Sequence, residues 1–100
     1  MKAKITRNAA KVLKRELALP ENEGKYVRVL ITLDHGDHVH YGIDFDTPKE
    51  NDEVVSTDKE IDLVLETGKP MLDGIKVDYL YFPKEGFVIT NPAQGNHFHD

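Results

Sequence analysis

Hydrophobic residues recur at one period in the first twenty residues and at another in the rest of the chain. Near the start they lie three or four positions apart, which predicts an amphipathic helix over about Arg7–Leu19. The residues of this apolar stripe are Ala9, Ala10, Val12, Leu13 and Leu17. Thr6 offers an N-cap side chain, Pro20 ends the helix, and Lys2–Ile5 is predicted to be a short preceding strand.

Beyond Lys25, apolar residues alternate with polar ones, which predicts strands that bury one face. Tyr26–Leu33 and Val39–Phe45 are the clearest runs. Asp34–His38 between them is short enough for a hairpin turn, with Gly36 at its centre. The residues expected to face the core are Val27, Val29, Ile31 and Leu33 in the first run and Val39, Tyr41, Ile43 and Phe45 in the second.

Further short strands and one helical turn complete the pattern. The strands are predicted over Val54–Thr57, Ile61–Glu66, Ile75–Phe82 and Gly86–Thr90, and the helical turn over Thr67–Leu72. One hundred residues make one domain, so residues 1–100 are predicted to form a single, mostly β (α+β) unit. We expect a flattened barrel or small sandwich with an N-terminal helix, followed by a flexible tail over residues 93–100.

Composition excludes several kinds of chemistry. The sequence has no cysteine, which excludes disulfides and thiolate sites. Ser56 is the only serine, and it lacks the Gly-x-Ser-x-Gly context of a serine hydrolase. The net charge of −5 argues against nucleic acid as a partner, and no apolar run approaches the roughly 20 residues of a membrane span. We therefore expect a cytoplasmic protein that binds neither nucleic acid nor membrane.

Charge is distributed unevenly along the chain. Residues 1–15 carry six basic residues and no acid, whereas the remaining part carries 7 bases and 18 acids. An acid-free basic start is one feature of an organelle transit peptide. Because the segment also supplies a strand and a helix to the domain, we favour a solvated basic face or a surface that docks an acidic partner.

All five histidines lie in two short clusters. They are His35, His38 and His40 in the predicted hairpin and His97 and His99 near the C-terminus. In an extended chain, residues two apart project to the same side, so each His-x-His pair can present two imidazoles to one ion. Neutral imidazole binds zinc and iron, and Asp37 and Asp44 are candidate carboxylate ligands. The alternative is that the clusters are solvated loops without a metal.

Two enzyme classes share parts of this pattern. His35-Gly36-Asp37 contains the His-x-Asp half of a two-histidine, one-carboxylate iron site, but the chain is short for the cosubstrate pocket of an oxygenase. His38-x-His40 with Asp44 after it is similar to a cupin metal motif, but the second histidine motif with its flanking glycines is absent. A small β-fold non-haem iron enzyme is therefore kept as an alternative, without an assigned catalytic residue.

Four separated segments together resemble one protein family. They are Tyr41-Gly42-Ile43-Asp44-Phe45-Asp46, Asp52-Glu53-Val54-Val55, Leu72-Asp73-Gly74-Ile75-Lys76-Val77-Asp78-Tyr79 and Gly86-Phe87-Val88-Ile89-Thr90-Asn91-Pro92. In order and spacing they resemble the HesB/IscA-like family, the A-type iron–sulfur cluster biogenesis proteins. The resemblance extends over nearly the whole chain. It implies a mostly β pseudo-barrel of mixed sheets with an N-terminal helix, and a tendency to form homodimers or larger assemblies.

The histidine clusters stand where this family carries its cysteines. Usual members have one cysteine in a Gly-rich turn before the Tyr-Gly-Leu-Asp-Phe-Asp-like strand, where this chain has Gly36. They have a Cys-Gly-Cys near the C-terminus, where this chain has His97-Phe98-His99. The family fold brings the hairpin turn and the tail together. The resemblance therefore implies a nitrogen and oxygen site that suits one Fe²⁺ or Zn²⁺ better than a sulfide cluster, which proteins hold mainly through thiolates.

The resemblance and the histidines lead to one functional expectation. We expect a non-enzymatic protein of iron–sulfur cluster biogenesis that binds Fe²⁺ or Zn²⁺ through histidines, forms a homodimer and contacts a protein partner of that process. The alternative is a metal-free interaction scaffold of the same fold, which contacts such a partner through its basic N-terminal helix or its acidic strands.

Overall fold

The computed structural model describes residues 1–35 and 39–92, and the elements follow the predicted order. They are β1 (Ala3–Ile5), α1 (Arg7–Leu17), the 3₁₀ turn η1 (Pro20–Asn22), β2 (Tyr26–Asp34), β3 (Val39–Asp46), β4 (Asp52–Val55), β5 (Leu63–Glu66), the 3₁₀ turn η2 (Pro70–Leu72), β6 (Ile75–Leu80) and β7 (Gly86–Thr90). Each strand predicted from the hydrophobic pattern is present, which confirms the mostly β, α+β class.

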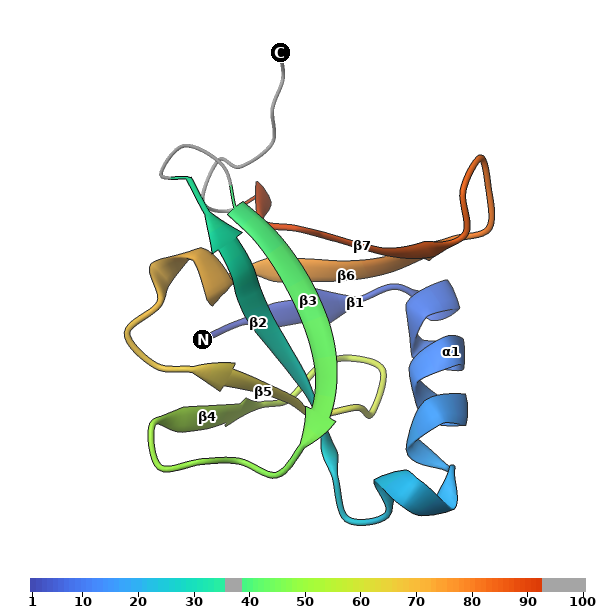
Figure 1. Cartoon of the computed structure of the whole chain (residues 1–100), viewed down its shortest axis with the longest axis horizontal. Coiled ribbons are helices and arrows are strands. Elements are labelled where there is room, and N and C mark those ends of the chain that lie inside the picture. The colour runs from blue at the N-terminus through green and yellow to red at the C-terminus, as the bar shows by residue number, and fades with distance from the viewer. Residues whose placement is uncertain (36–38, 93–100) are drawn as a thin grey trace.

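The strands form two mixed sheets, and α1 lies at one end of the space between them (Figure 1). One sheet has the strand order β1-β6-β7 and the other the order β3-β2-β5-β4. The pairs β1–β6 and β2–β5 are parallel, and the remaining pairs are antiparallel. Within the described residues the two sheets do not join into a closed barrel, and two mixed sheets with an N-terminal helix match the predicted α+β arrangement.

Helix α1 begins where the sequence predicts and ends earlier. The Thr6 backbone is extended, and its hydroxyl accepts a hydrogen bond from the first turn of the helix at 3.3 Å. The same hydroxyl donates to Asp78 on β6 at 2.7 Å, which ties the start of the helix to the sheet. The helix ends at Leu17 because Leu19 precedes Pro20 and therefore adopts an extended conformation, with φ −70° and ψ 142°.

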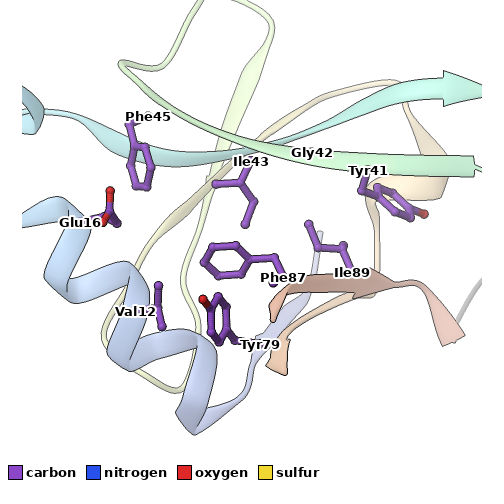
Figure 2. A pocket seen from close by; sticks show the side chains of 10 residues that line it. Val12, Glu16, Tyr41, Gly42, Ile43, Phe45, Tyr79, Phe87 and Ile89 are labelled. Carbon is purple, nitrogen blue, oxygen red and sulfur yellow. The ribbon is translucent and has the colours of Figure 1, made fainter. Parts of the chain in front are cut away.

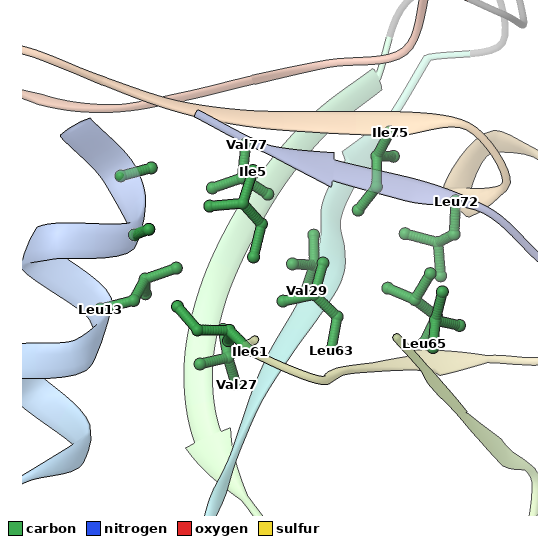
Figure 3. Packing of buried hydrophobic residues seen from close by; sticks show 13 residues of the cluster. Ile5, Leu13, Val27, Val29, Ile61, Leu63, Leu65, Leu72, Ile75 and Val77 are labelled. Atoms are coloured by element: carbon green, nitrogen blue, oxygen red, sulfur yellow. The ribbon is translucent and has the colours of Figure 1, made fainter. Parts of the chain in front are cut away.

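Side chains from α1 and from both sheets fill one hydrophobic core (Figure 3). The most deeply buried large residues are Ile5, Leu13, Val27, Val29, Leu63, Val64, Leu65, Leu72, Ile75 and Val77. All three apolar residues of β5 are buried, which identifies it as an interior strand; it lies between β2 and β4. The predicted apolar stripe of α1 is confirmed, since Ala9, Ala10, Val12 and Leu13 are buried.

The prediction that Leu33 faces the core is wrong. The register of β2 against β3 shifts between Ile31 and Leu33, which is a β-bulge at Thr32. The extra residue reverses the side to which the following residues point, so Leu33 lies opposite His40 and is 47% exposed. Odd-numbered residues of β2 therefore face the core up to the bulge, and after it they face away from the core.

Three strands have limits that differ from the predicted ones. Ile61 lies before β5, because its carbonyl oxygen accepts a hydrogen bond from the Thr57 hydroxyl at 2.7 Å and closes a turn. The predicted strand over Val54–Thr57 begins and ends two residues earlier, as β4. Strand β6 ends at Leu80, where it makes its last pair with Gly86.

A buried amide joins the end of β7 to the turn η2. The Asn91 side chain is fully buried, and its Nδ2 donates to the carbonyl oxygens of Met71 at 2.7 Å and Asp73 at 2.8 Å. The hydroxyl of Tyr41 on β3 donates to the same Met71 oxygen at 2.7 Å. Asn91 therefore holds the last described residues of the chain against β3 and η2.

A second buried polar contact joins β2 to β4. The Arg28 guanidinium donates to both carboxylate oxygens of Asp52, to Oδ1 at 3.1 Å, and the Lys49 backbone N–H donates to Oδ2 at 2.5 Å. The Asp52 side chain is only 2% exposed. Burial by itself would raise the pKa of Asp52, but the Lys49 N–H and the Arg28 guanidinium outweigh it and hold the pKa below its ordinary value.

Replacing Asn91 with alanine is expected to destabilise the fold by about 1–3 kcal/mol, because the carbonyl oxygens of Met71 and Asp73 each lose the Asn91 donor, although the Met71 oxygen keeps the Tyr41 hydroxyl. Urea unfolding measures the change. The matched control is Thr90→Ala at the exposed neighbouring position, which should shift the unfolding midpoint much less. Equal midpoints for the two variants would contradict this role for Asn91.

Replacing Asp52 with asparagine is expected to cost about 2 kcal/mol at pH 7, because Arg28 is left mostly buried beside a neutral group. Since the pKa of Asp52 is lowered in the folded state, its contribution is complete above the unfolded value of about 4 and is lost as pH falls through the folded value. The difference in the free energy of unfolding between wild type and Asp52→Asn should therefore shrink at low pH.

Urea unfolding at pH 7 and pH 3 tests this dependence. Asp58→Asn is the control, because Asp58 makes an exposed ion pair with Lys59 and its loss should matter much less. The lowered pKa of Asp52 would be contradicted if the free energies of unfolding of wild type and Asp52→Asn differed equally at both pH values.

Candidate functional site at the β2–β3 turn

Two of the predicted histidines flank the turn between β2 and β3. His35 directly follows the last residue of β2, and His40 is the second residue of β3; both are exposed. The register places Asp34 opposite Val39 and Leu33 opposite His40. The candidate ligands Asp37, His38, His97 and His99 lie outside the described residues.

The alternation of β3 places His40 on the side away from the core, and the bulge in β2 brings Leu33 to that same side. Because directly paired antiparallel residues share a face, His40 and Leu33 lie on the outer side. Tyr41 lies on the opposite side of β3, where it packs against the core. Imidazole ligands on β3 would therefore be open to solvent, away from the hydrophobic core.

Asp44 lies on the same strand face as His40 but far along it. Four residues of strand separate their Cα atoms by about 13 Å, which is too far for one ion to bind both side chains in a short coordination sphere. The Asp44 carboxylate accepts the N–H of Phe45 at 2.9 Å, and Asp44 is paired in register with Arg28. Among residues 1–35 and 39–92, no group of three or more histidines and acids could hold a metal ion.

The end of β7 meets this end of β3 through Tyr41 and Asn91. Burial raises the pKa of the Tyr41 phenol; its hydrogen bond with Asn91 opposes the rise and the charge of Asp34 adds to it. Asp34, at the end of β2, is thus close enough to affect Tyr41. Sequence reasoning did not single out Asn91, although an asparagine between the last strand and Pro92 was a usable signal of a side chain that closes a turn.

On the other side of β3 from His40 lies a groove of about 490 Å³, shown in Figure 2, with both polar and apolar atoms in its lining. It is lined by Val12 and Glu16 of α1, Tyr41, Gly42, Ile43 and Phe45 of β3, and Tyr79, Gly86, Phe87 and Ile89 of β6 and β7. The rings of Tyr79 and Phe87 meet edge to face, with centroids 4.8 Å apart. The sequence predicted that Tyr41, Ile43 and Phe45 face the core, and they pack against it while also lining the groove.

The described part of the chain contains no helix that is both long and apolar enough to span a membrane.

No family model matches the chain, and no curated protein matches it in sequence. Solved structures match its fold. Escherichia coli SufA, which is involved in biosynthesis of iron–sulfur clusters, superposes with a TM-score of 0.69 at 22% identity, over 92% of this chain and 87% of SufA. IscA with a [2Fe-2S] cluster superposes with a TM-score of 0.71 at 19% identity, over 90% of this chain and 85% of IscA. The chain therefore has the HesB/IscA-like fold, as its sequence motifs predicted.

Proposed function

We propose that this chain is a non-enzymatic, cytoplasmic protein of iron–sulfur cluster biogenesis that binds Fe²⁺ or Zn²⁺ through histidines and contacts a protein partner of that process. The observation that carries the proposal is the fold, which extends over at least nine tenths of the chain in both solved structures. Both of those proteins are described by their relation to iron–sulfur clusters. In this function the metal ion is the cargo of the protein.

The donor set supports a single ion. The sequence has no cysteine, so a cluster held by the usual thiolates is excluded, whereas imidazole is a good ligand for both metals. His35 and His40 lie on either side of one turn and are exposed, so an ion from solvent can reach them. We assign His38, His97 and His99 as further ligands and Asp37 as a candidate carboxylate; the strand spacing leaves Asp44 out of a site that contains His40.

The position of Asn91 supports a contribution from the C-terminal histidines. Asn91 is held beside Tyr41, near the turn end of β3. His97 lies six positions after Asn91, and a chain of that length spans at most about 20 Å. His97 and His99 are therefore within reach of the turn.

A metal-free interaction scaffold is the second candidate. Arg7, Lys11 and Lys14 are exposed on α1, and residues 1–15 contain no acid. Such a face suits an acidic partner, and its binding would weaken as salt rises. The non-haem iron enzyme has less support, because the groove of Figure 2 lies on the opposite side of β3 from His40.

Anaerobic calorimetric titration of the metal-stripped full chain with Fe²⁺ and with Zn²⁺ tests the proposal. We expect saturable binding with a dissociation constant of about 10 μM or tighter. His97→Ala/His99→Ala and His35→Ala/His40→Ala should each weaken it at least about tenfold. Acidification should also weaken binding, because protonated imidazole cannot bind a metal.

Asp44→Asn is the matched control and should bind as wild type does, since Asp44 lies about 13 Å along the strand from His40. Absent binding, or equal binding in wild type and both histidine variants, would contradict the metal site. If the chain then bound an acidic protein partner in a salt-sensitive way, and Lys11→Glu/Lys14→Glu abolished that binding, the scaffold would be favoured.

A further inference from the structure

Strand β1 is an edge strand of the three-stranded sheet, because within the described residues it pairs only with β6 (Figure 1). The Lys2 carbonyl oxygen accepts the Gly74 N–H at 2.7 Å, just before β6. The Thr6 N–H donates to the Val77 carbonyl oxygen at 2.9 Å. Because backbone groups of successive strand residues point to alternate sides, the N–H and C=O of Ala3 point away from β6. One edge of β1 is therefore open to pairing with another strand.

A cavity of about 790 Å³ lies along β1. Residues 1–4 line one part of it, residues 56–58 after β4 line another, and residues 74–76 and Pro92 complete the lining, which is mostly apolar. Cavities that bind ligands in proteins have volumes of about 300–1,000 Å³. The edge strand is therefore bordered by a space of the size that proteins use for binding.

Three lysines lie together on the outer face of the sheet beside this cavity. Lys4 on β1 is paired in register with Lys76 on β6, and Lys2 lies two residues before Lys4 on the same face. All three are exposed, and all three line the cavity. Like charges directly opposite each other on neighbouring strands destabilise a sheet. An anionic group beside these lysines would remove the repulsion between them.

The nearby acids already have other partners. Asp58, the one acid among the lining residues, pairs with Lys59 at 2.9 Å. The hydrogen bond from Lys59, with a smaller contribution from the charge of Lys4, holds the pKa of Asp58 below its ordinary value. Asp73 accepts the Lys2 backbone N–H at 2.9 Å. Within residues 1–35 and 39–92, the ammonium groups of the three lysines make no hydrogen bond and no ion pair.

An antiparallel strand beside β1 would satisfy both the open edge and the lysines. Its residue opposite Ala3 would exchange two main-chain hydrogen bonds with Ala3, and its side chain would lie on the inner side, where Ala3 packs against the core. The residues before and after it would lie on the outer side, opposite Lys2 and Lys4. The edge therefore suits an extended segment with an apolar residue between two acids. A second copy of β1 does not suit it, because lysines would then face lysines.

We propose that β1 binds an extended acidic segment of a partner protein by strand addition, with an apolar residue of that segment opposite Ala3 and its acidic neighbours beside Lys2, Lys4 and Lys76. This inference gives a surface and a chemistry to the protein partner of the proposed function, and it rests on that partner contact alone. The surface shares no residue with the proposed metal site, so peptide binding and metal binding are measured separately.

Fluorescence anisotropy with the full chain tests the proposal, and the probe is a fluorescein-labelled Glu-Val-Glu-Val-Glu peptide. We expect saturable binding with a dissociation constant of about 100 μM or tighter, which weakens as salt rises. The Gln-Val-Gln-Val-Gln peptide should bind at least about tenfold more weakly, because it lacks the charges that meet the lysines. The parent peptide N-methylated at both valines should also bind at least about tenfold more weakly, because it cannot donate the main-chain N–H to Ala3.

Charge reversal locates the binding surface. Lys4→Glu/Lys76→Glu should weaken binding of the parent peptide at least about tenfold. Lys11→Glu/Lys14→Glu on α1 is the matched control: it changes the net charge equally, at exposed residues, and should change the dissociation constant by less than about threefold. Hydrogen exchange of the Ala3 amide should slow when the peptide is bound, because that N–H then donates to the peptide. Circular dichroism confirms that both variants are folded.

Three results would overturn the proposal. One is a wild-type chain that does not bind the parent peptide at about 1 mM. Another is equal weakening by the two lysine variants, which would place the acidic peptide elsewhere. The third is an N-methylated peptide that binds as tightly as the parent, since charge alone would then account for the binding. The calorimetric metal titration does not depend on any of these results, so failure of strand addition and failure of the metal site are distinguishable.

Discussion

Thirteen buried side chains from α1, both sheets, the turn η2 and the segment before β5 pack into one hydrophobic core, and the rest of the structure depends on this shared burial. Each large side chain removed from water contributes about 1.5–3 kcal/mol, whereas the total stability of a domain of this size is of the order of 10 kcal/mol. Neither sheet can bury its apolar face without the other and α1. The two sheets must therefore face each other even though no strand pairing joins their edges within the described residues.

That arrangement separates the exposed histidine on β3 from the groove. A strand at the edge of a facing pair of sheets has one side toward the core and the other toward solvent, and β3 is such a strand. His40 lies on its outer side near the turn, and Tyr41, Ile43 and Phe45 line the groove on its inner side. The proposed metal site and the groove therefore lie on opposite sides of one strand and share no side chain.

Buried polar groups hold the loops that the core alone would leave free. Asn91 satisfies two carbonyl oxygens around η2, and Asp52 joins Arg28 to the Lys49 turn. Among the described residues that are not exposed, no buried side-chain nitrogen or oxygen lacks a hydrogen-bond partner. Such complete pairing fixes the path of each loop, because any shift would leave a desolvated polar group without a partner.

The sequence by itself determined the order of the elements, their type and most of the residues that face the core. Periodicity records which side of each element is buried, so Ala9, Val27 and Val29 were predictable without a structure. The tertiary structure decided the bulge at Thr32, the burial of Asn91 and the groove between β3 and β7, because each depends on residues far apart in the chain. Leu33 shows the reason most clearly: one inserted residue reverses the face of those that follow it, and only the register against the neighbouring strand fixes where that insertion lies.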